Sequence, residues 1–280
     1  MTNSNPPAPS RPLRVAAEVL ENAVEGPGNH RLVLAIPGWP GAEPGQFVML
    51  SPGGSSEAER TDPLLPRPMA VYRGHAAARG GRAEVEFLLK VTGRGTRLLA
   101  DLAPGQSIRL VGPLGSAFAP VVPGKRAILV GGGTGIASLY ELASRGAADA
   151  EVHVILGARS EGDLMGVDDF EALEVDCHIT TEDGSRGRKG RVTDALAELL
   201  EAPGPPAELF ACGPTPMMHA CAKIAQEQRL ECQVSLENNM ACGFGVCLGC
   251  AVPVHSGGYS LVCRAGPVYP ADQVVWEGLP

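Results

Sequence analysis

Four cysteines towards the C-terminal end of the chain are spaced for metal binding. Cys242, Cys247 and Cys250 form a C-x4-C-x2-C loop, and Cys263 follows after twelve intervening residues. This spacing is typical of plant-type [2Fe–2S] sites, where four thiolates hold two iron atoms. Glycines within the loop permit a backbone path tight enough to bring N–H groups close to the inorganic sulfides. The sequence therefore predicts a [2Fe–2S] cluster.

Two other structures also use clustered cysteines. A structural zinc site usually takes two short C-x2–4-C hooks, whereas this chain has one three-cysteine loop and one distant cysteine. A disulfide framework is typical of short secreted domains. This chain has 280 residues, and its stretch from Met1 to Pro12 lacks the apolar core of a signal peptide. Zinc is the stronger alternative to the iron–sulfur cluster.

The length of 280 residues is enough for two domains and a small appendage. A net charge of −8 argues against nucleic acid as a partner, and no apolar run is long enough to predict a membrane span. Cys177, Cys221 and Cys232 lie in apolar segments and are interpreted as buried free thiols. Reduced thiols beside an iron–sulfur site predict a cytoplasmic protein.

Residues 11–122 are predicted to form an antiparallel β-barrel domain, after a disordered lead-in over residues 1–10. Apolar side chains alternate with polar ones along Ala83–Val91, as in a half-buried strand. A polar loop over Gly53–Asp62 is interpreted as a surface insertion. Further short, β-rich segments bounded by glycine or proline are Arg31–Ile36, Gln46–Leu50, Met69–Tyr72 and Ser107–Val111.

Two motifs of this domain are suited to binding an anion. Arg67 precedes Pro68 in an extended backbone, so its guanidinium is able to contact a phosphate bidentately. An ordinary surface arginine is the alternative. Gly93-Arg94-Gly95-Thr96 leads into a helical segment, Arg97–Leu102, where N–H groups and the helix dipole favour a pyrophosphate. A simple glycine turn with a threonine cap is the alternative.

Residues 123–236 change to short strands that alternate with helices, which predicts a doubly wound parallel sheet. The expected helices are Ile136–Arg145, Val192–Leu200 and Pro216–Arg229. The expected strands are Arg126–Val130, Glu151–Leu156, Val175–Thr180, Glu208–Ala211 and Glu231–Leu236.

A glycine-rich loop, residues 131–136, joins the first of these strands to the first helix, where open parallel sheets bind nucleotides. It does not match G-x-G-x-x-G, and no acidic residue ends the second strand, so the usual ribose contact is not expected. Close packing of helix on sheet is the alternative use of these glycines. Cys212 follows the fourth strand, either beside the nucleotide crevice or as a buried structural cysteine. Thr215 is expected to cap the next helix, with Pro216 at its first position.

Taken in order, these motifs resemble the ferredoxin–NADP reductase superfamily. The C-terminal cluster loop narrows the resemblance to the electron-transfer subunits of class B dihydroorotate dehydrogenases, over about residues 11–275. The resemblance implies a mixed β and α/β fold: an FAD-binding barrel, an NAD(P)-binding parallel-sheet domain and a [2Fe–2S] domain at residues 237–280. The motifs are Arg67-Pro68-Met69-Ala70, Gly93-x-Gly95-Thr96, Gly112-Pro113-Leu114-Gly115, Gly131-Gly132-Gly133-Thr134-Gly135 and Cys212-Gly213-Pro214-x-Pro216-Met217-Met218.

The resemblance also implies a role for each motif. Cys212 is expected to lie near the nicotinamide, where hydride passes to or from flavin N5. Cys242, Cys247, Cys250 and Cys263 are expected to bind the cluster. The implied FAD-binding residues are Arg67, Pro68, Met69, Ala70, Gly93, Gly95 and Thr96. The implied NAD(H)-binding residues are Gly133, Thr134, Gly135, Gly213 and Pro214.

Three positions leave cofactor properties open. The family commonly carries serine or threonine near flavin N5, where this chain has Ala70 and offers only a backbone N–H. The family often has an acidic residue after the last cysteine, where this chain has Ala265. The first departure leaves the flavin potential open, and the second leaves the cluster potential open. Arg159 is able to contact a 2′-phosphate, whereas the resemblance favours NAD.

The resemblance implies an electron path from nicotinamide through FAD and the cluster to a partner. Nicotinamide transfers electrons in pairs, whereas the cluster accepts one electron at a time. A flavin can do both, and so connects the two. The implied partner is an FMN-containing catalytic subunit that oxidises dihydroorotate to orotate in pyrimidine biosynthesis, in a heterotetramer of two plus two chains. This path needs no general acid or base, so His153, His178 and His219 are interpreted as packing or surface residues.

Two alternatives stay open. The same cofactors fit an NAD(P)H reductase subunit of a hydrogenase, a sulfide dehydrogenase or a ferredoxin-linked transhydrogenase, and only the partner distinguishes these. A flavin-free sensor that carries the cluster is the second alternative, and Ala70 gives it some weight. The absorption of bound FAD would exclude that sensor.

Overall fold

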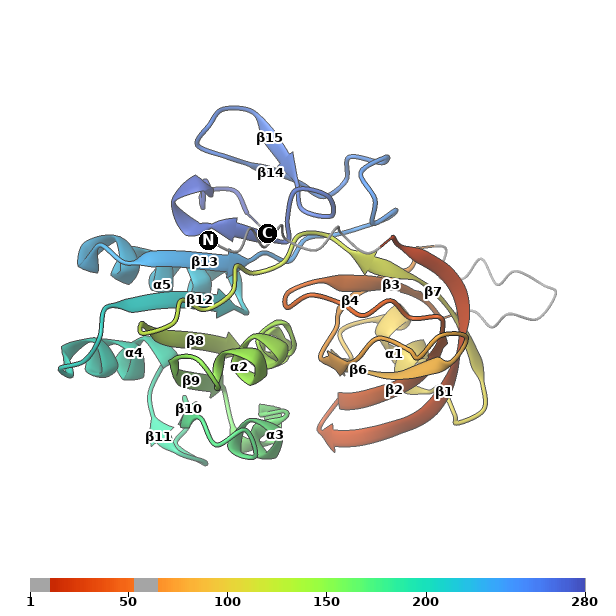
Figure 1. Cartoon of the computed structure of the whole chain (residues 1–280), viewed down its shortest axis with the longest axis horizontal. Coiled ribbons are helices and arrows are strands. Elements are labelled where there is room, and N and C mark those ends of the chain that lie inside the picture. Colours follow the sequence, from red (N-terminus) through yellow and green to blue (C-terminus); the bar gives the residue numbers. More distant parts are fainter. Residues whose placement is uncertain (1–10, 53–64, 280) are drawn as a thin grey trace.

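The computed structural model describes residues 11–52 and 65–279. The predicted lead-in at residues 1–10 and the predicted loop Gly53–Asp62 lie outside the described residues. Figure 1 shows a β-barrel beside a parallel-sheet domain, with the C-terminal segment running along one side of both. The fold class expected from the sequence is confirmed.

The barrel is an antiparallel sheet in the order β4-β3-β7-β1-β2-β6-β5. Its core is apolar and includes Val19, Leu34 and Phe87, which are fully buried. The helix predicted at Arg97–Leu102 begins three residues earlier, as α1 (Arg94–Ala100). The strands are β1 (Leu13–Gly26), β2 (Asn29–Pro37), β3 (Phe47–Ser51), β4 (Arg67–Ala70), β5 (Arg73–Gly74), β6 (Arg82–Lys90) and β7 (Ser107–Leu114).

Strand β1 was not among the predicted strands, although it is the longest and pairs with both β2 and β7. Only Ala17 and Val19 of its 14 residues are buried. Leu13, Val15, Ala17 and Val19 alternate with more exposed residues, but the exposed apolar residues Ala16 and Leu20 on the other face weaken the pattern.

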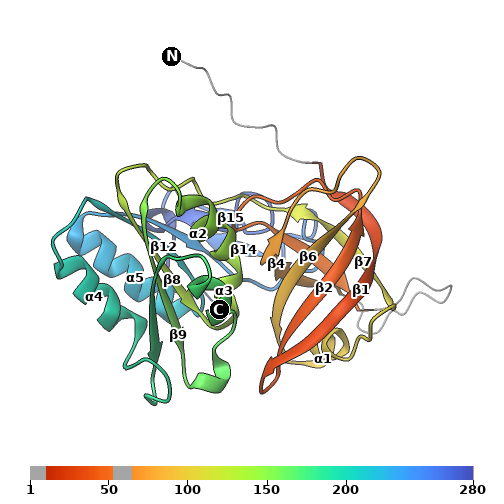
Figure 2. The same ribbon diagram turned by 60° about the horizontal axis from the view of Figure 1, so that its bottom comes forward.

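The second domain is a parallel sheet in the order β11-β10-β9-β8-β12-β13, with the C-terminal β16 added at one edge. Helices α4 and α5 cover one face, and α2 and α3 cover the face towards the barrel (Figure 2). The strands are β8 (Arg126–Gly132), β9 (Glu151–Ala158), β10 (Asp176–Thr181), β11 (Arg188–Lys189), β12 (Ala207–Cys212) and β13 (Glu231–Ser235). The helices are α2 (Tyr140–Gly146), α3 (Val167–Glu171), α4 (Val192–Glu201) and α5 (Thr215–Gln228).

Two details of this domain differ from the sequence prediction. The expected helix Ile136–Arg145 is instead a 3-10 helix over Gly133–Ser138 followed by α2. Thr215 is the first residue of α5 and not its cap, since Pro214 occupies the capping position with φ −53° and ψ 137°. The fixed φ of proline suits that extended position, so the helix begins one residue earlier than predicted.

The C-terminal segment holds the hairpin β14 (Ala251–Pro253) and β15 (Tyr259–Leu261), and then β16 (Val268–Pro270). Strand β16 pairs antiparallel with β13 and so extends the sheet of the second domain, which was not expected. One apolar core contains Met49 of the barrel, Val234 of β13 and Val262 of this segment. The three predicted domain ranges therefore stay predictions, because the third shares its core with the other two.

An ionic network joins the barrel to α3. Asp169 of α3 bonds to Arg31 at 2.5 Å, to Arg73 at 2.9 Å and to the hydroxyl of Tyr72 at 2.8 Å. Burial opposes ionisation of Asp169, but the hydrogen bonds from Arg31 and Tyr72 and the charges of both arginines hold the pKa of its carboxyl below the usual value. The network therefore links the barrel to the second domain.

Asp169→Asn is expected to lower the free energy of unfolding by about 1–2 kcal/mol at pH 7, because Arg31 and Arg73 each lose one carboxylate partner, while their ion pairs with Glu25 and Glu86 remain. The pKa of Asp169 is lowered in the folded state, so its contribution is present above the unfolded value of about 4 and is lost as the pH falls through the folded value. Urea unfolding of wild type and variant should therefore converge in acid. Asp168→Asn is the control, since that side chain is 96% exposed. An equal loss of unfolding free energy in both variants would contradict the stabilising role of the Asp169 network.

Among the described residues, no helix is long and apolar enough to cross a membrane.

Candidate functional site: a cysteine loop, a nucleotide cavity and a barrel cradle

The four spaced cysteines come together in the C-terminal segment. The backbone N–H of Cys263 donates to the sulfur of Cys250 at 3.4 Å, and the two thiols hydrogen-bond to each other. Cys242 and Cys247 form a second hydrogen-bonded pair. Two pairs of sulfurs suit two irons, because each iron of a [2Fe–2S] cluster takes two protein thiolates.

Backbone N–H groups of the loop point at the sulfurs. Desolvation opposes ionisation, but N–H groups of Cys247, Phe244 and Val246 lower the pKa of the Cys242 thiol to about 6. The N–H of Gly245 faces the sulfur of Cys263 in the same way. N–H groups aimed at thiolates are the outer-shell contacts that stabilise a bound cluster. The donor set and its surroundings therefore fit a [2Fe–2S] cluster.

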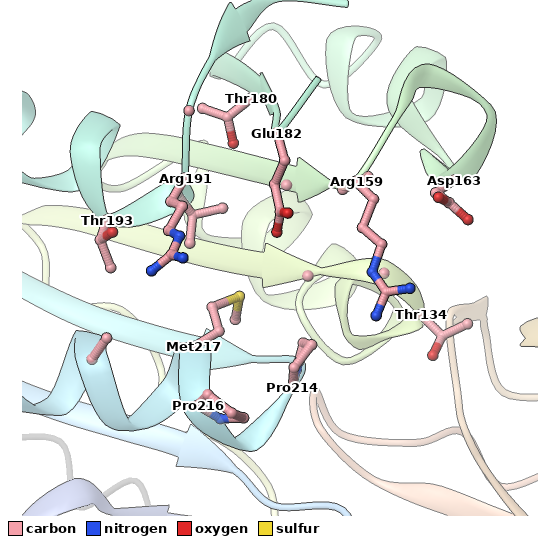
Figure 3. Close-up of a pocket in the computed structure, with 18 of the residues that line it drawn as sticks. Thr134, Arg159, Asp163, Thr180, Glu182, Arg191, Thr193, Pro214, Pro216 and Met217 are labelled. Atoms are coloured by element: carbon pink, nitrogen blue, oxygen red, sulfur yellow. The ribbon is translucent and has the colours of Figure 1, made fainter. Parts of the chain in front are cut away.

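A cavity of about 640 Å³ opens at the carboxyl ends of the parallel strands. Figure 3 shows the side chains of Arg159, Glu182 and Arg191 on its upper wall, and Met217 below them. This edge of an open parallel sheet is where such folds bind nucleotides. The residues predicted for NAD(H) that line it are Gly133, Thr134, Gly213 and Pro214.

Gly135 has a different role from its neighbours. A Cβ at Gly135 would lie 2.5 Å from the carbonyl carbon and oxygen of Cys212 and 2.6 Å from the nitrogen of Gly213. A Cβ at Gly133 would meet nothing within 4 Å, so that position is open to a ligand. Gly135 therefore serves close packing of two turns, whereas Gly133 lines the cavity, and its contact with a nucleotide stays a prediction.

Cys212 ends β12 and pairs with Gly131 of β8 and Ser235 of β13. It is 1% exposed and does not line the cavity. Burial raises the pKa of its thiol to about 12, although hydrogen bonds to Ser138 and Ser235 act in the opposite direction. The thiol is therefore neutral at physiological pH and is not a thiolate nucleophile.

The barrel residues predicted for FAD meet at the start of α1. A Cβ at Gly95 would lie 2.2 Å from Nε of Arg67, so the arginine packs directly on the glycine turn. The Arg67 guanidinium also donates to the carbonyls of Leu65 and Pro66. The Thr96 hydroxyl bonds to N–H groups of its own turn, from Thr92 at 2.9 Å and Gly93 at 3.1 Å.

The remaining predicted flavin residues, Pro68, Met69 and Ala70, continue β4 from Arg67 and are half-buried. Ala70 packs against the apolar cluster that contains Tyr72 and Ile136, at the boundary between the barrel and the second domain. A cationic guanidinium on a glycine turn, beside a half-buried strand that reaches the second domain, fits a dinucleotide phosphate with its reactive ring near that boundary.

Gly93→Ala is expected to weaken FAD binding while the chain still folds. Gly93 has an extended backbone, with φ −173°, and a Cβ there would meet nothing within 4 Å. Only a ligand lying over the turn would be displaced, at an overlap cost of about 1–3 kcal/mol. The FAD content after gel filtration and the melting temperature of the flavin-free chain measure the two effects separately. Unchanged FAD retention would contradict the prediction that FAD lies over the turn at Gly93.

Several cavity residues were not predicted. Glu182 follows β10, Arg191 precedes α4, and Thr193 and Met217 lie in the first turns of α4 and α5. The topology of a parallel sheet is the signal that points to them, because all strand ends and helix starts at its carboxyl edge converge. Arg159, which was considered for a 2′-phosphate, does line the cavity.

Two family models match the chain. The model described as the iron-sulfur cluster binding domain of dihydroorotate dehydrogenase B matches residues 237–275. The model described as an oxidoreductase NAD-binding domain matches residues 129–223. The first range contains all four cysteines of the loop, and the second contains the glycine turn and Cys212.

Curated relatives and solved structures agree with these matches. The chain is 36% identical over 266 residues to the dihydroorotate dehydrogenase B (NAD(+)) electron transfer subunit of Caldanaerobacter subterraneus subsp. tengcongensis, covering 94% of this chain and 95% of the relative. It is 41% identical over 234 residues to the probable subunit of Methanopyrus kandleri, covering 83% and 80%.

A chain of the NADH-dependent reduced ferredoxin-NADP oxidoreductase superposes with a TM-score of 0.80 at 30% identity, covering 94% of this chain and 91% of that one. The ferredoxin reductase in carbazole 1,9a-dioxygenase superposes with a TM-score of 0.65 at 22% identity, covering 80% and 68%, and shares the fold. Flavin, nicotinamide and iron–sulfur cofactors, and an oxidoreductase activity, follow from these relationships together. The chain belongs to the family of dihydroorotate dehydrogenase B (NAD(+)) electron transfer subunits.

Proposed function

We propose that the chain moves electrons between NAD(H), FAD and a [2Fe–2S] cluster, to or from an FMN-containing catalytic dihydroorotate dehydrogenase subunit. The observation that carries this proposal is the shared core that holds the cysteine loop against both the barrel and the parallel sheet. In this proposal the cluster lies against the nucleotide domain and against β3 of the barrel, whose Met49 pairs with Pro68 of the proposed flavin site. When bound, FAD and the cluster supply the exchange between paired and single electrons.

The residues of the chain bind and position these groups. In this proposal Arg67, with Gly93 and Gly95, holds the FAD phosphates, and Gly133, Thr134, Gly213 and Pro214 hold the dinucleotide. In this proposal buried Cys212, which pairs with Gly131 at the start of the glycine turn, positions that turn beside the dinucleotide. Cys242, Cys247, Cys250 and Cys263 hold the iron.

The partner surface is proposed at the tip of the cysteine loop. Phe244, Val246 and Leu248 are 55%, 73% and 63% exposed, and Cys247 beside them is exposed as well. Exposed apolar side chains grouped around a redox centre are suited to docking a partner that takes electrons there. We propose a heterotetramer of two plus two chains, in which each catalytic subunit covers one such loop.

NAD(H) is the proposed dinucleotide. Arg159 and Arg191 share the cavity with the carboxylates of Glu182 and Glu237, so an additional phosphate would meet both signs of charge. The proposed location is the cytoplasm, because all eight cysteines are free thiols.

The test uses the purified, cofactor-loaded chain alone and then with the catalytic subunit. Alone, the chain is expected to reduce an artificial dye with NADH and to show no oxidation of dihydroorotate. With the catalytic subunit added, dihydroorotate should reduce NAD+. Dihydroorotate oxidation by the isolated chain would contradict the division of labour, because the second flavin belongs to the partner in this account.

A second candidate is favoured by the solved-structure match at a TM-score of 0.80. That match makes a ferredoxin-linked transhydrogenase subunit the main alternative, with the same cofactors and a different partner. Anaerobic co-purification followed by mass spectrometry distinguishes the two. A catalytic dihydroorotate dehydrogenase subunit is expected, and a ferredoxin:NADP-type subunit in its place would support the alternative.

A further inference from the structure

Three side chains outside the electron path converge at the amino ends of two neighbouring strands. His153 lies near the start of β9, and Asp176 and His178 lie at the start of β10. The strands are parallel, with Asp176 opposite His153. The nucleotide cavity uses the other ends of these strands, at Gly157 and Thr180, so the two regions are separate.

The three donor atoms are already arranged as one face of a tetrahedron. Nδ1 of His153 lies 2.9 Å from Oδ2 of Asp176 and 3.4 Å from Nε2 of His178. Nε2 of His178 lies 3.2 Å from the same Asp176 oxygen. An ion bound tetrahedrally at about 2.0–2.1 Å separates its ligand atoms by about 3.3 Å. The three separations are close to that value.

Glu151 completes the arrangement from the far side of His153. Its Oε1 lies 2.8 Å from Nε2 of His153. A carboxylate on one ring nitrogen fixes the proton there and turns the lone pair of the other nitrogen towards a metal, as in carboxylate–histidine–zinc triads. Here the other nitrogen is Nδ1, the atom that faces Asp176 and His178.

Glu151 and Asp176 flank the two ring nitrogens of His153, and Nε2 of His178 shares the Asp176 oxygen. A divalent cation satisfies all three donors at once. The side chains are 10%, 31% and 58% exposed for His153, His178 and Asp176, so the inner ligand is anchored and the outer side is open to water as a fourth ligand.

We propose that His153, His178 and Asp176 bind a divalent transition-metal cation of the zinc type, with Glu151 orienting His153. Two imidazoles and one carboxylate suit zinc, whereas magnesium and calcium prefer oxygen ligands. The bound ion cross-links β9 and β10 where the sheet lacks a further strand, because β11 pairs with β10 only at Thr180 and Thr181. The site lies away from the cavity and the cysteine loop, so the bound ion takes no part in the electron path.

The test is zinc binding by the full chain with its iron–sulfur cluster and FAD in place, measured by equilibrium dialysis and metal analysis. Wild type is expected to bind one more zinc per chain than His178→Ala, with equal iron in both. Glu151→Ala should bind that zinc about 10–100-fold more weakly. His255→Ala, at an exposed histidine elsewhere in the chain, is the matched control and should bind like wild type.

Cobalt gives a second readout, because tetrahedral Co²⁺ absorbs visible light. The difference spectrum of wild type with and without Co²⁺ should show this absorption over that of FAD and the cluster, and Asp176→Asn, a change at an exposed side chain, should lose it. Equal zinc uptake by wild type, His178→Ala and Asp176→Asn would overturn the proposal. Zinc uptake that occurs only when the cysteines are free of iron would also overturn it, because the cysteine loop would then be the zinc ligand.

Discussion

Cys263→Ala is expected to reduce bound iron from two atoms per chain to near zero and to stop electron transfer to the partner. Cys263 is buried beside Cys250 and supplies the one sulfur from outside the loop. Without it one iron lacks its second thiolate, and a [2Fe–2S] cluster with three protein sulfurs is not retained. FAD content and NADH-driven dye reduction should persist, because the flavin cradle and the nucleotide cavity are made by other residues.

The measurements are iron and sulfide content after anaerobic purification, and NADH-linked turnover with the catalytic subunit. Cys177→Ala is the matched control, since Cys177 is a free cysteine in β10. The control should keep its iron and its turnover. Full iron in the Cys263→Ala chain would remove Cys263 from the ligand set and favour a different fourth ligand.

Gly135→Ala is expected to lower kcat/KM for NADH by about 100-fold, the size of loss that follows a displacement of about 1 Å at a reacting centre. The added Cβ would lie 2.5 Å from the Cys212 carbonyl, and both partners are backbone, so the two turns must move apart. The displacement of these turns shifts the cavity wall beside the proposed position of the nicotinamide. Rapid-mixing measurement of flavin reduction by NADH tests this directly.

Gly204→Ala is the control for this variant. Gly204 lies before β12, and its added Cβ would meet only the flexible guanidinium of Arg126 at 3.2 Å. It should reduce flavin at the wild-type rate. Retained FAD and iron in Gly135→Ala would show that the chain has folded, and a normal rate of flavin reduction in that folded variant would refute the positioning role of the glycine.

The general architecture was predictable because its signals are local. The cysteine spacing, the alternation along Ala83–Val91 and the change to strand–helix repeats after residue 122 each depend on neighbours in sequence. The fold class and the cofactor set are both confirmed. The individual cofactor contacts stay predictions, since they require the ligands themselves.

What sequence analysis missed depends on contacts between distant residues. Strand β16 joins the sheet through β13, more than thirty residues earlier, and nothing in its three residues indicates that pairing. The contact of Gly135 with Cys212 and the bonds of Asp169 to the barrel arginines also arise only in the folded chain. These are packing properties, which local patterns do not encode.

The histidine cluster is the clearest case of this kind. His153 and His178 were interpreted as packing or surface residues, because the electron path needs no general acid or base. They are 25 positions apart in sequence. The parallel pairing of β9 with β10 brings them together with Asp176. A ligand set assembled across strands is invisible to a motif search, whereas the cysteine loop, which is local, was found at once.

The most direct test of the electron path is anaerobic titration of the purified chain with NADH, followed by visible and electron paramagnetic resonance spectroscopy. The account predicts about two irons, two sulfides and one FAD per chain. It also predicts that NADH bleaches the flavin absorption and produces the paramagnetic signal of a reduced [2Fe–2S] cluster. A colourless chain that holds zinc at the cysteines and gives no signal with NADH would contradict it.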